Sequence, residues 1–236
     1  RRQRQMCIRD SPCAVSQFRF RFSMGDSNQM IFIVDDDQDI RTSLTRALTQ
    51  RGFEVEAFAS GREFLAAYDG EQAACLVLDH GMPGMSGLEL QALLNGQGCP
   101  LAVVFITGHG GVPESVQAMK AGAVDFLEKP FRQSVLIERI ETALEIASAK
   151  RCALEMRRAL QARFNRLTAR EEEIVKRMLA NPAEVSSKEI ANSLGISPRT
   201  VDHHRARILE KLEIRSLVEL VDLVSKLRGE SATAPL

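Results

Sequence analysis

Tryptophan is absent from the 236-residue chain, and Tyr68 is its only tyrosine, which argues against a surface built for stacking on sugars or bases. No stretch approaches the ~18 consecutive apolar residues of a transmembrane helix, so we expect no membrane span and no membrane partner. The five cysteines are odd in number and lack the spacing of a zinc site, which favours reduced thiols in a cytoplasmic protein over a disulfide framework. Low complexity and wholesale disorder are excluded by an ordinary globular composition, with 44% hydrophobic and 26% charged residues.

The formal net charge of zero hides an uneven distribution. Residues 29–147 carry 8 Lys and Arg against 17 Asp and Glu, whereas residues 148–236 carry 17 against 12. An acidic module followed by a basic one suggests a cation- or phosphate-handling site joined to an anion-binding module. The chain starts without Met, and Met24 makes a natural start, so we interpret residues 1–23 as a non-native or disordered extension. Residues 229–236 are expected to form a disordered tail.

Between residues 30 and 147, short β-branched runs alternate with segments of helical periodicity. Strands are predicted at 31–34, 53–57, 76–78, 101–106 and 124–127, each followed by a helix. Ser60 and Glu63 predict a capping box at the start of the second helix. Five such repeats predict an α/β domain at 28–147 with the (βα)5 flavodoxin-like fold and a parallel sheet.

Polar residues stand where the predicted strands end, at Asp35, Asp36, Asp79, Thr107 and Lys129. The carboxyl ends of parallel strands meet at one sheet edge, which is where open α/β sheets bind ligands. The repulsion between three carboxylates there is offset if a hard divalent cation lies among them. Mg²⁺ fits such a site, because it is usually bound by a few carboxylates together with water. A neighbouring lysine and hydroxyl suit phosphoryl oxygens, so the residues suggest attack by a carboxylate on a phosphoryl group.

Four motifs in order make this region resemble the receiver domain of two-component response regulators: IFIVDDD at 31–37, LVLDHGMPGMSG at 76–87, FITGHGG at 105–111 and FLEKPF at 126–131. The resemblance implies that Asp79 is the phosphoacceptor and that Lys129 binds the phosphoryl group. It further implies that Thr107 and Phe126 form a switch pair.

The same resemblance implies a magnesium site. Asp36, Asp79 and the Gly81 carbonyl would bind Mg²⁺ directly, and Asp35 would act through a water molecule. A cis peptide bond before Pro130 is also expected.

Two other readings of the acidic run are weaker. The Asp35-x-Asp37-x-Asp39 pattern resembles half of an EF-hand loop, but Ile40 stands where that loop requires glycine and its bidentate glutamate is missing. The run also resembles the opening of haloacid-dehalogenase-type phosphatases, of which no later motif is clear. Asp37 and Asp39 are expected to be solvated residues at a helix cap.

The second module is helical. Residues 148–164 are predicted to be a helical linker that continues the last helix of the receiver. An all-α four-helix domain is predicted at 165–228, with helices at 168–179, 187–193, 198–212 and 216–227. Thr168 with Glu171 predicts a capping box, and Ser197 predicts an N-cap followed by Pro198. Two helices joined by a short turn, with a basic second member, are typical of a helix-turn-helix.

The segments LTARE at 167–171 and KEIANSLGISPRTVDHHRARILEKL at 188–212 resemble the LuxR-type DNA-binding domain. With the receiver, the resemblance to FixJ-like (NarL-like) regulators covers about residues 30–226. We expect phosphate contacts from Arg199, Thr200 and Arg205. We expect contacts with the groove floor from Asp202, His203, Ala206 and Arg207.

The combined resemblance implies a phosphorylation-dependent transcription regulator and not an enzyme. Its expected partners are a sensor histidine kinase, double-stranded DNA, a second copy of the chain on phosphorylation, and RNA polymerase. Two alternatives stay open. One is a phosphorylation-independent DNA-binding regulator with a degenerate or ligand-responsive receiver, and the other is a phosphohydrolase that uses Asp35 or Asp79.

Overall fold

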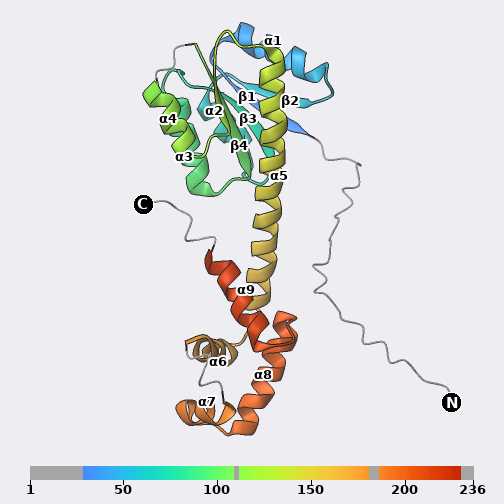
Figure 1. Ribbon diagram of the computed structural model, residues 1–236, viewed down its shortest axis with the longest axis vertical. Coiled ribbons are helices and arrows are strands. Elements are labelled where there is room, and N and C mark those ends of the chain that lie inside the picture. Colours follow the sequence, from blue (N-terminus) through green and yellow to red (C-terminus); the bar gives the residue numbers. More distant parts are fainter. Residues whose placement is uncertain (1–28, 109–111, 181–185, 230–236) are drawn as a thin grey trace, which may run out of the picture.

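A computed structural model describes residues 29–108, 112–180 and 186–229 of the chain. The predicted extension at 1–23 lies outside the described residues, as does the predicted tail apart from Gly229. In Figure 1 a sheet flanked by helices occupies one end and a helical bundle the other, and one long helix joins them. None of the helices in the described part of the chain combines the length and the hydrophobicity of a transmembrane span.

The first domain is built on a five-stranded parallel sheet in the order β2-β1-β3-β4-β5. The strands are β1 (Met30–Val34), β2 (Glu54–Phe58), β3 (Ala74–Asp79), β4 (Leu101–Thr107) and β5 (Asp125–Glu128). Every residue of β1, β3 and β4 is buried, as their uninterrupted apolar runs predict for strands covered on both faces. The predicted (βα)5 parallel architecture is confirmed.

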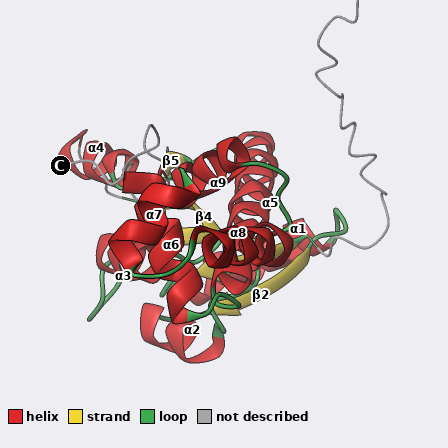
Figure 2. Ribbon diagram, turned by 90° about the horizontal axis from the view of Figure 1, so that it is seen from below, coloured by secondary structure: helices red, strands yellow, loops and turns green. Residues whose placement is uncertain are grey.

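Helices of the first domain cover both faces of this sheet (Figure 2). They are α1 (Gln38–Thr49), α2 (Gly61–Ala67), α3 (Gly87–Gln97), α4 (Val112–Lys120) and α5 (Gln133–Phe164). Alternate residues of each strand point to opposite faces. Phe32 therefore packs in one core with residues of α2, α3 and α4, and Ile31 packs in another with residues of α1 and α5.

Helix α5 runs without a break from the receiver through the residues of the predicted helical linker to Phe164. Its first part is anchored by buried residues such as Ile140 and Ala147. Further along, Lys150 Nζ donates to the Leu101 carbonyl at 2.7 Å, and the Arg158 guanidinium forms a bidentate ion pair with Glu71. These contacts join the part of α5 beyond its buried segment to the first domain.

The second domain consists of α6 (Ala169–Ala180), α7 (Ser187–Leu194), α8 (Pro198–Leu212) and α9 (Leu217–Gly229). Its core includes Val201, Ile208 and Leu212, whose spacing of seven and four residues places them on one face of α8. Gly195 ends α7 with a positive φ of 64°, and the Ser197 side chain caps α8 by accepting from the Thr200 N–H. The predicted helix-turn-helix is therefore confirmed in its caps as well as its helices.

One predicted cap differs. The Ser60 side chain does accept from the Glu63 N–H, but the Glu63 carboxylate accepts from the Ala59 N–H at 2.8 Å instead of the Ser60 N–H.

Glu171 does more than place negative charge at the start of α6. It forms the predicted capping box with Thr168, and its carboxylate also accepts from Lys211 Nζ of α8 at 2.6 Å. The glutamate is only 1% exposed. Burial raises the pKa of Glu171, but the hydrogen bonds from Lys211 and Thr168 outweigh it and lower the pKa to about 2.

This pairing predicts an acid-sensitive contact between α6 and α8. Because the folded-state pKa lies below the ordinary value, the stabilisation is complete above about pH 5 and is lost as the pH falls toward 2. Replacing Glu171 with Gln is expected to destabilise the domain by about 1–3 kcal/mol at pH 7 and by less at pH 3. Hydrogen exchange of α6 and α8 peptides at both pH values measures this. Glu172→Gln, on the exposed side of the same turn, is the matched control, and equal effects of the two changes would contradict the prediction.

Candidate functional site

The strand ends of the first domain bring three of the predicted site residues into direct contact. Asp35 follows β1, Asp79 ends β3 and Lys129 follows β5. Lys129 Nζ lies 2.8 Å from Asp35 Oδ2 and 2.9 Å from Asp79 Oδ1. Asp35 is fully buried and Asp79 is 7% exposed, so the ammonium group offsets two carboxylates that water barely reaches.

Backbone and side-chain donors hold the rest of this cluster. The other oxygen of Asp79 accepts from the Gly81 N–H at 2.8 Å, and Asp35 Oδ1 accepts from the Asp37 N–H at 2.9 Å. Arg41 of α1 donates from Nη1 to the Asp35 carbonyl at 2.7 Å. Burial lowers the pKa of Lys129, but the hydrogen bonds to the two carboxylates outweigh it, so the pKa lies above its ordinary value. Lys129 is therefore a fixed cation beside the Asp79 carboxylate.

The predicted magnesium ligands are only partly gathered. Asp36 is exposed beside the buried Asp35, and in the described part of the chain no three His, Cys, Asp or Glu side chains form a metal-binding group. The donor chemistry nevertheless fits a hard cation, because carboxylate and carbonyl oxygens are what Mg²⁺ takes in proteins. Receiver domains in general bind Mg²⁺ at their phosphorylation site.

The two predicted switch residues lie on neighbouring strands. Thr107 is 2% exposed at the end of β4, and its carbonyl accepts from the Lys129 N–H at 2.7 Å. Phe126 of β5 is partly buried, with its ring centroid 5.9 Å from that of Phe105 and 6.2 Å from that of His80. His80, the residue that follows Asp79 in the sequence, therefore packs beside the Phe126 ring. The Lys129–Pro130 peptide bond is cis, as expected.

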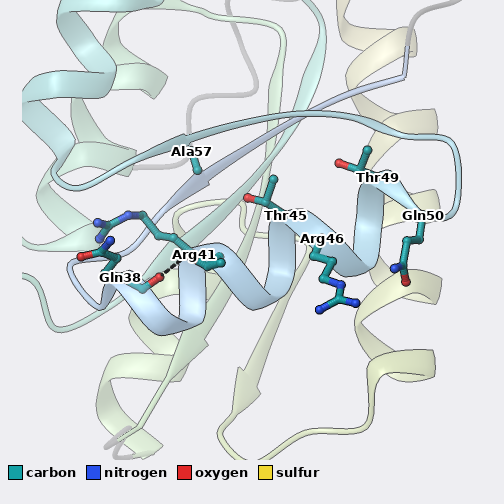
Figure 3. A pocket seen from close by; sticks show the side chains of 8 residues that line it. Gln38, Arg41, Thr45, Arg46, Thr49, Gln50 and Ala57 are labelled. Carbon is teal, nitrogen blue, oxygen red and sulfur yellow. Dashed lines mark hydrogen bonds between the residues drawn. The ribbon is translucent and has the colours of Figure 1, made fainter.

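A shallow groove follows the outer side of α1 next to β2 (Figure 3). Arg41 and Gln38 lie at one end of it and Gln50 at the other. Most of the residues that line it carry polar side chains, including Thr42, whose Oγ1 donates to the Gln38 carbonyl at 2.9 Å. Arg41 belongs both to this groove and, through its bond to Asp35, to the support of the acidic cluster.

All seven predicted DNA-contact residues lie on α8, and they differ in how they are held. Arg205 is partly buried, whereas the others are exposed: Arg199, Thr200, Asp202, His203, Ala206 and Arg207. Thr200 Oγ1 lies 2.7 Å from the Ser197 hydroxyl at the N-cap. Asp202 and Arg205 both hydrogen-bond to Ser187 at the start of α7.

Four residues whose contacts are described above escaped the sequence analysis. Arg41 had no local signal, because an arginine on the first turns of a helix is usually solvated. Ser187 gave only the signal of a helix start. Glu71 and Arg158 form their pair across 87 residues of sequence, where no local pattern reaches.

Comparison with known proteins covers both domains. The family described as the response regulator receiver domain matches residues 31–141, and the luxR family of bacterial regulatory proteins matches residues 165–224. The chain is 42% identical over 191 residues to the transcriptional regulatory protein FixJ of Rhizobium meliloti (strain 1021), covering 81% of this chain and 92% of that protein. It is 36% identical over 205 residues to the response regulator protein TodT of Pseudomonas putida, covering 87% and 89%.

Solved structures agree with this. The response regulator StyR matches with a TM-score of 0.70 at 43% identity, over 85% of this chain and 100% of that one. Full-length FixJ from B. japonicum matches with a TM-score of 0.51 at 38% identity, over 86% and 98%. The chain belongs to the FixJ-like family of two-component transcription regulators, which join a response-regulator receiver to a LuxR-type helix-turn-helix domain.

Proposed function

We propose that Asp79 accepts a phosphoryl group from a sensor histidine kinase, and that this controls the binding of α8 to promoter DNA. The observation that carries the proposal is the Lys129 ammonium held between Asp35 and Asp79 at 2.8 and 2.9 Å. A fixed cation beside a buried carboxylate is what phosphoryl transfer to that carboxylate requires, since negative charge builds up on the phosphoryl oxygens.

In the transfer, an Asp79 oxygen forms a bond to phosphorus while the bond from phosphorus to the donor's histidine nitrogen breaks. Lys129 Nζ then pairs with a phosphoryl oxygen, and the Gly81 N–H keeps Asp79 oriented. Asp35, Asp36, Asp79 and the Gly81 carbonyl are the residues that would hold Mg²⁺, which when bound offsets charge on the phosphoryl group. The acceptor of the phosphoryl group is Asp79 of the chain itself. We therefore propose that the protein does not act as an enzyme on a separate substrate.

The signal would leave the site through Thr107 and Phe126. Drawing Thr107 toward the phosphoryl group changes the end of β4, and the Phe126 ring repacks against Phe105 and His80. We propose that the altered surface forms a homodimer. Two copies of α8 then suit a promoter with two half-sites, where RNA polymerase is a further expected partner. With these partners the protein would act in the cytoplasm.

The test uses the full chain with Mg²⁺ and beryllofluoride, which stands in for the phosphoryl group. Light scattering is expected to show a shift from monomer to dimer, and acetyl phosphate is expected to add one phosphoryl group, found by mass spectrometry on the Asp79 peptide. Asp79→Asn is expected to abolish both effects.

Two outcomes would contradict the proposal. Wild-type protein that is folded, binds DNA and takes no label would favour a phosphorylation-independent regulator. Sustained hydrolysis of phosphomonoesters over many turnovers would favour a phosphohydrolase.

A further inference from the structure

The polar residues of α8 fall into two groups. One group hydrogen-bonds to α7, and the other is exposed. The Ser187 hydroxyl, at the start of α7, donates a hydrogen bond to the Asp202 carboxylate. The same oxygen accepts from Arg205 Nη1 at 3.1 Å. Asp202 and Arg205 are thereby held in a network that joins α7 to α8, and the acidic side chain on the first turns of α8 already has a donor.

A different set of side chains forms a stripe along α8. Arg199, His203 and Arg207 are spaced four residues apart, which places them on one face of the helix, and all three are exposed. Among the described residues, none of these three side chains forms an ion pair with a carboxylate. Ala206, also exposed, lies beside His203 and Arg207 and adds little bulk. A partner surface can therefore approach this face closely.

The stripe offers hydrogen-bond donors. The arginines carry guanidinium donors and no acceptor, and histidine donates from at least one ring nitrogen. In the major groove, guanine is the base that shows two acceptors side by side, N7 and O6, whereas adenine shows one acceptor and one donor and cytosine shows a donor. The carboxylate that would accept from cytosine or adenine is Asp202, which is engaged by Ser187.

We propose that His203 and Arg207 read guanines in each half-site of the DNA, and that Arg199 at the first turn contacts a phosphate. This assignment rests on the proposed binding of α8 to DNA. Residues four apart on a helix are separated by about 6 Å along its axis, and bases by about 3.4 Å along a strand. The two guanines are therefore expected about two base steps apart.

The experiment selects duplexes from a pool with a randomised 24-bp core, using the full chain with Mg²⁺ and beryllofluoride. The expected site carries two guanines per half-site at that spacing. Arg207→Ala is expected to lower discrimination at one guanine at least tenfold and His203→Ala at the other, since a good base contact is worth about a factor of ten or more. Arg199→Ala is the matched control, expected to weaken binding to all duplexes and leave base preference unchanged. Circular dichroism checks that each variant is folded.

The assignment is overturned if the selected sites lack guanine at these positions, or if both variants keep the wild-type preference. If the wild-type protein selects no sequence at all, the DNA-binding function itself fails, and this assignment fails with it. Selection of a defined site without these guanines leaves the DNA-binding function standing and removes only the base assignment.

Discussion

Replacing Lys129 with Met is expected to remove the phosphoryl response and to destabilise the receiver by about 2–4 kcal/mol. The Lys129 ammonium is the cation that two buried carboxylates share, at 2.8 Å from Asp35 and 2.9 Å from Asp79. Without it, both carboxylates lose a charged donor, although the backbone N–H groups of Asp37 and Gly81 still donate to them. Urea unfolding followed by circular dichroism measures the stability.

The same variant tests the chemistry. Labelling of Asp79 by acetyl phosphate is expected to slow at least tenfold, because a fixed cation near the developing charge typically contributes a factor of 10² or more. The beryllofluoride-dependent dimer is expected to disappear. Lys176→Met makes the same chemical change at an exposed site on α6, where the ion pair to Glu172 is 3.8 Å long, and is expected to change stability by less than about 0.5 kcal/mol. A Lys129 variant that still dimerises would show that another group carries the response.

Much of the cluster around Lys129 was predictable, because it follows from topology. Asp35, Asp79 and Lys129 end strands that must be parallel, so their side chains meet at one sheet edge whatever the details of packing. Asp36 shows the limit of that argument. It is adjacent to Asp35 in sequence, but only one of two consecutive side chains can turn inward at a strand end, and Asp36 is the exposed one.

Pairings across long stretches of sequence were not predictable for a different reason. Glu71 and Arg158 each look like ordinary solvated charges, and they meet because α5 continues past the sheet in a fixed direction. Lys211 reaches Glu171 only because α8 crosses α6 at that turn. In both cases hydrophobic packing determines where the helices lie. The charged pairs then form because that packing brings the two side chains together.

The start of α3 gives the second large prediction, that Gly87→Ala destabilises the receiver by about 3 kcal/mol or more. A Cβ at this position would lie 2.5 Å from the Asp79 carbonyl oxygen and 2.8 Å from a ring carbon of Phe105. The carbonyl cannot give way, because Asp79 ends a central strand of the sheet and the Gly87 N–H itself donates to His80 at 3.2 Å. Any relief must move the backbone next to Asp79, the proposed phosphoacceptor, so labelling of Asp79 is expected to fall together with stability.

Gly96, in the same helix, is the control for this change. A Cβ there would have no neighbour within 4 Å, so Gly96→Ala is expected to stabilise the receiver by up to about 1 kcal/mol through helix propensity. Urea unfolding of the two variants side by side separates crowding from propensity, because the chemical change is identical. A Gly87 variant as stable as the Gly96 variant would mean that α3 can shift away from β3. The glycine at the first turn of α3 would then not be what allows this helix to approach Asp79 so closely.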